Sequence, residues 1–412
     1  MENPTPLPLQ ILEPFEYHKK LKAHFKSRKK TWNWFSGEKL KEQQIQEFKT
    51  NLLKNTYRMD RDVYPELYTT ADEICKKLAI DAKVFIYQEN NSTQFNAGIS
   101  VINAEAHIML SGNLLNLLTK EEMKALLAHE LSHYLFYKIE NEEYEIAQRI
   151  VLALANDSRS EDAIIETARI FQLYLELFCD AGALLICEDH HVVIRTLVKM
   201  NTGLSEVNPE SYLEQAKEIM KGDTESSQHH THPESYIRSL ALMLRFEKDE
   251  EYFDKIKKMI CGPLNLNSLD IFEQVEMSEL TERLIQLIVR PKWINTASIM
   301  NLCTKYFSNF TKSESLEKIE AIAERIESAH DSVKEYACYV LLDFTMVDSD
   351  LEGLGMGHTL QIAELLSISK EYENIVRKEL KLTARDFKQI QERVIKELEQ
   401  LTEGKEDSIY NE

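Results

Sequence analysis

The sequence predicts a mainly helical α+β protein in which one small β-sheet lies among helices, followed by an all-helical C-terminal region. Three segments rich in β-branched and aromatic residues, 84–88, 98–102 and 107–110, are the only ones that favour strands. Elsewhere apolar residues recur every three to four positions, which is the spacing of one helix face. After Pro263 this helical spacing continues almost to the end of the chain.

The composition describes a globular protein with a strongly acidic balance. The chain has 412 residues, of which 43% are hydrophobic, enough for two domains with sizeable cores. The net charge of −20 argues against nonspecific binding of nucleic acid by the whole molecule. Six scattered cysteines form no CxxC pair, as expected for reduced thiols in the cytosol. The N-terminus has no apolar secretory core, so we expect a cytoplasmic protein.

Residues 1–60 form a polar N-terminal region that is expected to be helical after a Pro-rich start. A basic run, 18–30, is followed by the aromatic sequence 32–35. The simpler interpretation is a solvated helix whose aromatic side chains pack on the next domain, or whose charges fold back onto acidic surface. The alternative is peripheral contact of residues 18–35 with anionic lipid, with the aromatic rings in the headgroup zone.

The next region, 61–260, carries the clearest chemistry. A helix is expected after Thr119, which is placed to cap it. His129 and His133 are four residues apart, so both imidazoles lie on one face of this helix and can share one Zn²⁺ ion. Glu130 lies beside them, where it can act as a general base toward water at the metal.

A third ligand decides which kind of metal site this is. The metzincin class requires Gly at 136 and His or Asp at 139, so Phe136 and Ile139 exclude it. Instead, the apolar segment 170–187 contains two acids four residues apart, Glu176 and Asp180, which need partners if buried. Glu176 is the simplest third ligand, and Asp180 can accept the free N–H of a ligand histidine. The alternative is that Arg or Lys from another helix pairs with both acids.

A histidine-rich loop, 228–232, precedes Pro233, which marks an expected helix start. Such loops are often only solvated, and His229 and His230 are interpreted in that way. The amphipathic helix behind the proline places Arg238 in its second turn. From these residues alone, catalysis is only one of several roles open to Arg238 and to His232, the last histidine of the loop.

Taken together, these motifs resemble the M48 family of gluzincin metallopeptidases, which includes the HtpX-like and CAAX prenyl proteases. The resemblance covers about residues 80–245. It rests on five motifs in order: Phe95-Asn96-Ala97-Gly98-Ile99, the segment 107–115, His129-Glu130-x-x-His133, Glu176-x-x-x-Asp180, and Thr231-His232-Pro233 with Arg238.

This resemblance implies a gluzincin-type metalloprotease domain that holds one zinc ion per chain. The ligands it implies are His129, His133 and Glu176, with Glu130 as the general base. The pairing of Asp180 with a ligand histidine agrees with the family's third-ligand motif.

The resemblance also implies a cleft beside the metal. In the family, the residues that correspond to His232 and Arg238 lie at this cleft and help to bind the polarised carbonyl oxygen. An extended substrate could add to an edge of the sheet, and Asn96, Ala97 and Gly98 are the expected edge strand. His107 also lies in a strand, where a structural role is expected.

Three features depart from the family pattern. Family members often have transmembrane helices, and none is expected here, because an acid near the centre of 170–187 would cost about 2.5 to 3.5 kcal/mol in a membrane. Gly98 follows Ala97 where the family has a bulky residue. Two small residues follow Asp180 in place of an Arg-containing continuation.

Residues 265–402 are expected to form a helical domain, with 403–412 as an acidic tail. Part of this domain, 339–380, resembles TerB-like tellurite-resistance helical domains. Its acidic loop 348–352 is compatible with a divalent cation, but a capping loop is the simpler interpretation. No catalytic pattern occurs there, so we interpret the domain as a regulatory or interaction module. The expected helices are 280–290, 298–308, 315–327, 332–346, 359–366 and 384–401.

The function expected from the sequence is hydrolysis of peptide bonds by a soluble zinc endopeptidase that acts on proteins or peptides. Zinc would lower the pKa of a bound water toward about 7, and Glu130 would take its proton and return it to the leaving amine. We expect gating by the helical domain or by a protein partner bound through 265–402. The alternative is a latent or non-catalytic metal-binding scaffold or sensor. The intact Glu130 favours the peptidase, because a structural zinc site has no use for a base.

Overall fold

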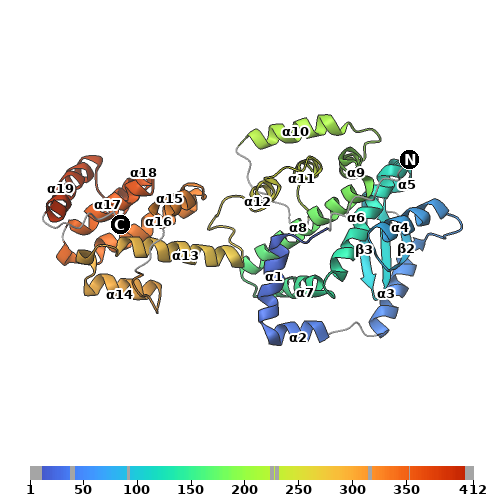
Figure 1. The fold of residues 1–412 in the computed structure, drawn as a ribbon, viewed down its shortest axis with the longest axis horizontal. Helices are drawn as coiled ribbons and strands as arrows, with labels where there is room; N and C mark the ends of the chain where they lie inside the picture. Colours follow the sequence, from blue (N-terminus) through green and yellow to red (C-terminus); the bar gives the residue numbers. More distant parts are fainter. Residues whose placement is uncertain are drawn as a thin grey trace, which may run out of the picture. The chain divides into compact units, whose positions relative to one another are not determined.

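A computed structural model of the chain shows a helical protein with one small sheet (Figure 1). The described residues are 12–37, 42–90, 93–222, 227, 232–313, 318–351 and 353–403. The chain divides into two compact units, Met1–Gly262 and Pro263–Glu412. His229, His230, Thr231, Glu352 and the tail from residue 404 were singled out in the sequence and lie outside the described residues.

The sheet has four strands in the order β1-β2-β4-β3. β2 and β4 run parallel, whereas β1 pairs antiparallel with β2 and β3 pairs antiparallel with β4. β3 therefore lies at one edge, paired on one side only among the described residues. The three predicted strands are present, and the short β1 was not predicted. The strands are β1 Thr56–Arg58, β2 Lys83–Glu89, β3 Asn96–Ile102 and β4 Glu105–Ser111.

The central strand β4 explains why the sheet forms where it does. Ala106, Ile108 and Leu110 alternate along β4 and are fully buried on one face. His107 points to the other face, where its ring nitrogens lie 3.1 Å from the Tyr87 hydroxyl and 3.2 Å from a Glu105 carboxylate oxygen. These contacts give His107 a structural environment within the sheet.

The helix α6, Lys120–Lys138, begins at a capping box. The Thr119 hydroxyl accepts a hydrogen bond from the Glu122 backbone N–H, and the Glu122 carboxylate accepts one from the Thr119 N–H. The same carboxylate is 2.9 Å from Lys199 Nζ on α9, His190–Thr202. Because Leu127 and Leu131 are fully buried, α6 is held inside the unit along the face next to its histidines.

The helix α8, Asp162–Cys187, is the core helix of the first unit and packs along α6. A Cβ atom at Gly182 would lie only 1.9 Å from the Ser132 hydroxyl, so glycine permits the close approach of these two helices. The small residues after Asp180 thus have a packing role. α8 is the one helix among the described residues that is long and apolar enough to span a membrane, but 83% of its apolar window is buried inside the protein.

The other helices of the first unit cover this core. α1 places His18 in the interior, where its ring lies 3.1 Å from the Phe171 carbonyl and burial lowers its pKa to about 3. Lys22 on α1 pairs with Glu140, so part of the basic run folds onto acidic surface. The bounds are α1 Glu16–Ser27, α2 Lys29–Gly37, α3 Glu42–Asn55, α4 Pro65–Lys77, α5 Leu114–Leu117, α7 Glu143–Ala155, α10 Pro209–Lys221, α11 Ser235–Phe246 and α12 Tyr252–Cys261.

The second unit is all-helical in its described residues and has its own apolar core. Within it, the hydroxyls of Thr345, Thr359 and Tyr372 hydrogen-bond one another in the interior. The predicted helices are present, and α18 was not predicted. The bounds are α13 Ile271–Ile288, α14 Ala297–Tyr306, α15 Ile319–Glu327, α16 Asp331–Met346, α17 Leu354–Leu365, α18 Ser369–Glu379 and α19 Ala384–Glu403, with short 3-10 helices at Lys292–Ile294 and Ser349–Leu351.

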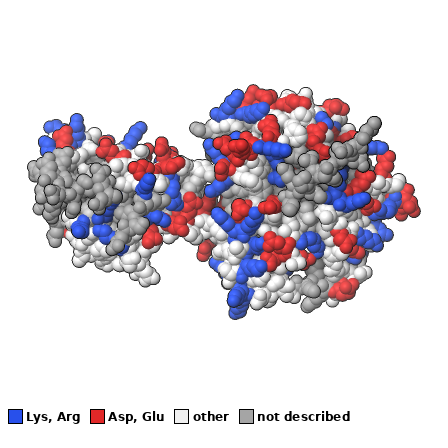
Figure 2. Space-filling model, viewed as in Figure 1, with Lys and Arg blue, Asp and Glu red and all other residues white. Residues whose placement is uncertain are grey.

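The predicted fold class, mainly helical with a small sheet and a helical C-terminal region, is confirmed. On the face drawn in Figure 2, basic side chains are interspersed with acidic ones in the described part of each unit. The described part of that face shows no large basic area.

Candidate metal centre

Two helices bring the predicted ligands together. His129 and His133 project from one face of α6, and Glu176 projects from α8 between them. Nε2 of His129 lies 3.4 Å from Glu176 Oε2, and Nε2 of His133 lies 3.5 Å from Glu176 Oε1. Glu176 is more than forty positions away from either histidine in the sequence. They therefore meet only because α6 and α8 pack side by side.

These distances fit a metal ion. Two ligand atoms that are each about 2.0–2.2 Å from a tetrahedral zinc ion lie about 3.3–3.5 Å apart. Three nitrogen-bearing side chains approach Glu176 Oε2 to within 3.5 Å, yet this buried oxygen receives no hydrogen bond of good geometry. A buried carboxylate oxygen without a donor is costly, so this arrangement suits a cation.

Asp180 fixes one of the two imidazoles. Its Oδ1 lies 3.0 Å from His129 Nδ1, which leaves Nε2 directed toward Glu176. Asp180 also accepts two hydrogen bonds from the Arg238 guanidinium, at 2.6 and 2.7 Å. Asp180 therefore contacts a histidine and also pairs with an arginine from another helix, the two kinds of partner that the sequence left open for it. Its contact with His129 is the arrangement that orients metal ligands in proteins.

The charges of the group also favour a cation. Burial opposes a charge on His129, but Asp180 and Glu176 outweigh it and raise its pKa to about 10. Burial likewise opposes ionisation of Glu176, yet the histidine beside it holds the pKa of the carboxyl well below its usual range. By contrast, burial lowers the pKa of His133 to about 4. A proton on His129 thus balances the negative charge of Asp180 and Glu176. A bound metal ion would balance the same charge with both imidazoles neutral.

Glu130 lies at the same centre, facing the cleft. Its side chain is buried, and burial raises the pKa of its carboxyl to about 7. A carboxylate with a pKa near neutrality can both accept and return a proton at physiological pH. The electrostatic environment of Glu130 is therefore the one that a general base requires.

A cleft of about 530 Å³ opens beside these residues. Asn96 and Ala97, at the start of the edge strand β3, line it, whereas Gly98 does not. Phe95 also lines the cleft and rests on two glycines with positive φ, Gly112 and Gly203. A Cβ atom at either glycine would come within 3.0 Å of the Phe95 ring, so both residues permit its position.

Another part of the cleft lining comes from α9, which was not predicted to be part of the site. Val193, Leu197 and Met200 lie along one face of this helix and line the cleft, and Tyr212 of α10 joins them. Their spacing of three and four residues is visible in the sequence, but it is also the spacing of an ordinary core face. The pattern alone could not separate a cleft wall from core.

His232 and α11 also border the cleft. His232 is 57% exposed, and its Nδ1 lies 2.9 Å from Glu176 Oε2. α11 begins at Ser235, two residues after the Pro233 that was expected to mark the start, and it carries Arg238. Arg238 directs its guanidinium at Asp180. Its Nη2 is also 3.5 Å from Glu176 Oε2, and the side chain is only 11% exposed.

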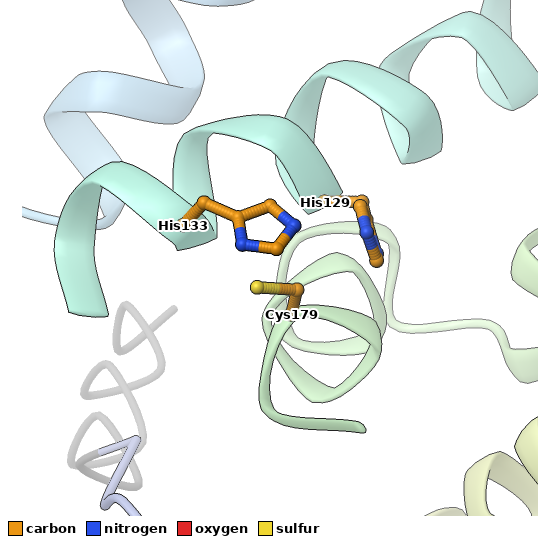
Figure 3. A group of neighbouring side chains, drawn as sticks. All are labelled: His129, His133 and Cys179. Atoms are coloured by element: carbon orange, nitrogen blue, oxygen red, sulfur yellow. The ribbon is translucent and has the colours of Figure 1, made fainter. Parts of the chain in front are cut away.

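Cys179 also lies at this centre and was not among the predicted site residues. Its sulfur and one ring nitrogen from each of His129 and His133 lie within 4.8 Å of one another. Figure 3 shows Cys179 on the helix beneath the two rings. A second group of metal-ligand atoms, Asp189, His190 and His191, occurs at the start of α9. There the Asp189 carboxylate accepts the His191 backbone N–H, so its role as a helix cap accounts for its position.

A His-Glu-x-x-His helix whose two histidines meet a glutamate from a second helix, beside a cleft, is the arrangement of the metallopeptidase class. Residues 64–243 match the sequence model of peptidase family M48, and this part of the chain is a member of that family. The predicted M48 resemblance is thereby confirmed. The chain matches no curated protein and no solved structure.

Proposed function

We propose that the protein is a zinc-dependent endopeptidase and that His129, His133 and Glu176 hold its metal ion. The observation that carries this proposal is the meeting of both imidazoles with one buried carboxylate at 3.4 and 3.5 Å. Zinc held there would act as a Lewis acid toward a peptide carbonyl and would activate water. Asp180 would orient His129, as the contact at 3.0 Å supports.

The chain's own residues would perform the proton transfers. Glu130 takes a proton from the attacking water and delivers it to the departing amine, a role that suits its raised pKa. His232 is exposed at the cleft, which supports a role for it in donating a hydrogen bond to the developing oxyanion. The bidentate pair of Arg238 with Asp180 supports a positioning role for this arginine, with its charge adding to the stabilisation of the oxyanion.

The cleft supports an extended peptide as the substrate. β3 is an edge strand and begins at Asn96 and Ala97 in the cleft, so a peptide could pair with it as an added strand across Asn96, Ala97 and Gly98. Side chains of such a peptide would face the apolar wall formed by α9. A cytoplasmic site of action and gating through residues 265–402 complete the proposal.

The second candidate is a metal-binding scaffold or sensor whose helical unit binds a partner. The size of the second unit favours this candidate, because a unit of this size can bind a partner. The described residues of that unit hold no group of metal-ligating side chains. The burial of Glu130 beside the metal-ligand group favours the peptidase, because a scaffold has no need for a base with a raised pKa.

Replacement of Glu130 by Gln tests the choice between these two functions. The variant keeps the size of the side chain but cannot accept a proton, so we expect it to bind one metal ion and to lose hydrolysis by a factor of about 100 or more. The measurement is cleavage of a proteome-derived peptide library, with metal content determined in parallel. Equal cleavage by both proteins would remove Glu130 from the mechanism. No cleavage by either, with or without cell extract as a source of partners, would favour the scaffold.

A further inference from the structure

Cys179 lies at the metal centre but has no part in the proposed mechanism. It is a free, fully buried cysteine in the stretch of α8 that also carries Glu176 and Asp180. Its sulfur lies within 4.8 Å of a ring nitrogen of His129 and of His133 (Figure 3). No other cysteine among the described residues is grouped with two histidines in this way.

A second observation marks this position as one that lacks a partner. Glu176 is nine-tenths buried, and its Oε2 receives no hydrogen bond of good geometry, although Nδ1 of His232 lies 2.9 Å away. Nδ1 of His133 is also buried and unpaired. Buried polar atoms without partners are rare in native proteins, and an ion between these side chains would satisfy the carboxylate oxygen. The thiol of Cys179 is therefore next to a place where a cation is expected.

The remaining distance is within reach of a side-chain movement. At a tetrahedral zinc ion, a sulfur at about 2.3 Å and a nitrogen at about 2.0–2.1 Å are about 3.5 Å apart. The sulfur of Cys179 lies within 4.8 Å of a ring nitrogen of each histidine. Rotation about one bond, χ1, shifts a cysteine sulfur between staggered positions while the helix stays in place.

We propose that Cys179 is a fourth protein ligand of the ion in the resting protein, which makes the centre a closed site of two histidines, one glutamate and one cysteine. This inference rests on the proposed function. Ligation converts the thiol to a thiolate and releases one proton to solvent. A zinc site with four protein ligands keeps no open position for water, whereas a catalytic site needs one. The resting protein is thus latent, and hydrolysis begins only when Cys179 leaves the ion.

Cobalt substitution tests this inference without relying on activity. Co²⁺ replaces zinc in the full-length protein, and a thiolate ligand gives a sulfur-to-cobalt charge-transfer band in the near ultraviolet, separate from the visible d–d bands. We expect the band in the wild type and its complete loss in Cys179→Ala, with one cobalt still bound. Cys187→Ala, on the same helix but outside the centre, should keep the band. Cys179→Ser serves if the alanine variant does not fold, as judged by circular dichroism.

The outcomes separate this inference from the proposed function. One bound cobalt with d–d bands but no sulfur band in the wild type would overturn the inference and leave the metal site standing. A sulfur band that persists in Cys179→Ala would also overturn it. No bound cobalt in the wild type would overturn the proposed metal site and the inference with it. Faster peptide hydrolysis by Cys179→Ala than by the wild type, together with loss of the band, would support latency.

Discussion

At the scale of single residues, the centre is a balance of buried charges. Glu176 and Asp180 lie one turn apart on α8, and each would be costly to bury alone. Asp180 is compensated by Arg238, whereas Oε2 of Glu176 has nitrogen neighbours at 2.9–3.5 Å but no hydrogen bond of good geometry. The two acids therefore differ in environment: Asp180 is paired with a guanidinium, whereas Oε2 of Glu176 has no hydrogen-bond partner, as suits the metal ligand proposed above.

This difference predicts the effect of replacing Glu176 by Ala. The variant leaves two imidazoles without the carboxylate that links them, so we expect loss of bound metal after dialysis. The measurement is metal content per chain. Glu166→Ala is the matched control, because Glu166 lies on the same helix and pairs with Arg169 outside the centre. Unchanged metal content in Glu176→Ala would show that another side chain is the third ligand.

The buried His358 of the second unit gives a pH dependence with a definite sign. Its Nε2 donates to the Ile288 carbonyl at 2.8 Å, and burial lowers the pKa of the ring from 6.5 to about 4. Above pH 6.5 neither the folded nor the unfolded state is protonated at this residue. Between pH 6.5 and about 4 only the unfolded state takes up the proton, so stability falls, by at most about 1.4 kcal/mol for each pH unit.

Urea unfolding of the second unit at several pH values measures this effect. In His358→Gln the fall in unfolding free energy between pH 6.5 and 4 should be smaller than in the wild type, because the titrating ring is absent. Lys370→Gln, at an exposed residue of the same unit that carries no imidazole, is the control and should retain the wild-type slope. Equal slopes in His358→Gln and the wild type would mean that the unfolded and folded states bind this proton alike.

At the scale of elements, the approach of α8 to α6 determines whether the ligands meet. Gly182 faces Ser132, whose hydroxyl donates to the Ala128 carbonyl at 2.7 Å. A methyl group at 182 would lie 1.9 Å from that hydroxyl oxygen and 2.7 Å from the Ser132 Cβ. The two helices would then have to separate, and Glu176, a turn and a half away, would move from the histidines.

Gly182→Ala should therefore weaken both the fold and the metal site. We expect a loss of about 1–3 kcal/mol in unfolding free energy from overpacking, and weaker metal binding. Ser132→Ala removes the closest atom, so the double variant should recover part of the loss. Gly37→Ala, where a Cβ atom would meet nothing within 4 Å, is the control. A stable Gly182→Ala with full metal affinity would contradict the close packing of α6 and α8.

The elements also show how far the sequence alone predicts this molecule. The strands β2, β3 and β4 and the helix α6 were predictable because their residue types and capping signals are local. β1 was not, since its three residues are mostly exposed and carry no periodicity. α18 was missed because it is highly charged and buries only Tyr372, Ile375 and Val376.

Long-range pairings were harder to predict than elements. The sequence could suggest that Asp180 needs a cation or a histidine, but not that Arg238, 58 positions away, would supply two hydrogen bonds to it. Cys179 gave no signal, because it stands in a segment that is apolar nearly all round. The cleft wall of α9 has the pattern of core, and only its position beside the cleft distinguishes it.

At the scale of the whole molecule, the chain consists of two units that each have their own core. The first ends at Gly262, and the described residues of both the metal-ligand group and its cleft belong to it. The second unit is helical in its described residues, and its core residues are apolar side chains of its own helices. Units of about 150 residues or more bury enough surface to fold independently.

The division predicts that residues 1–262 and 263–412 fold when produced separately. We expect a single cooperative urea transition from each fragment, and one bound metal ion per chain from the fragment 1–262 alone. Circular dichroism and metal analysis are the measurements, with the full-length chain as the reference. A fragment 1–262 that is unfolded or metal-free would show that the metal site depends on the helical unit.

The same fragments test the proposed gate. If residues 263–412 restrain hydrolysis, the fragment 1–262 should cleave peptides faster than the full chain, and adding the separate helical fragment should slow it again. If the second unit instead recruits substrate or an activating partner, the fragment should match the full chain on short peptides and fall behind on folded proteins. Equal rates on both substrates would exclude gating by this unit and leave Cys179 as the element that controls access to the ion.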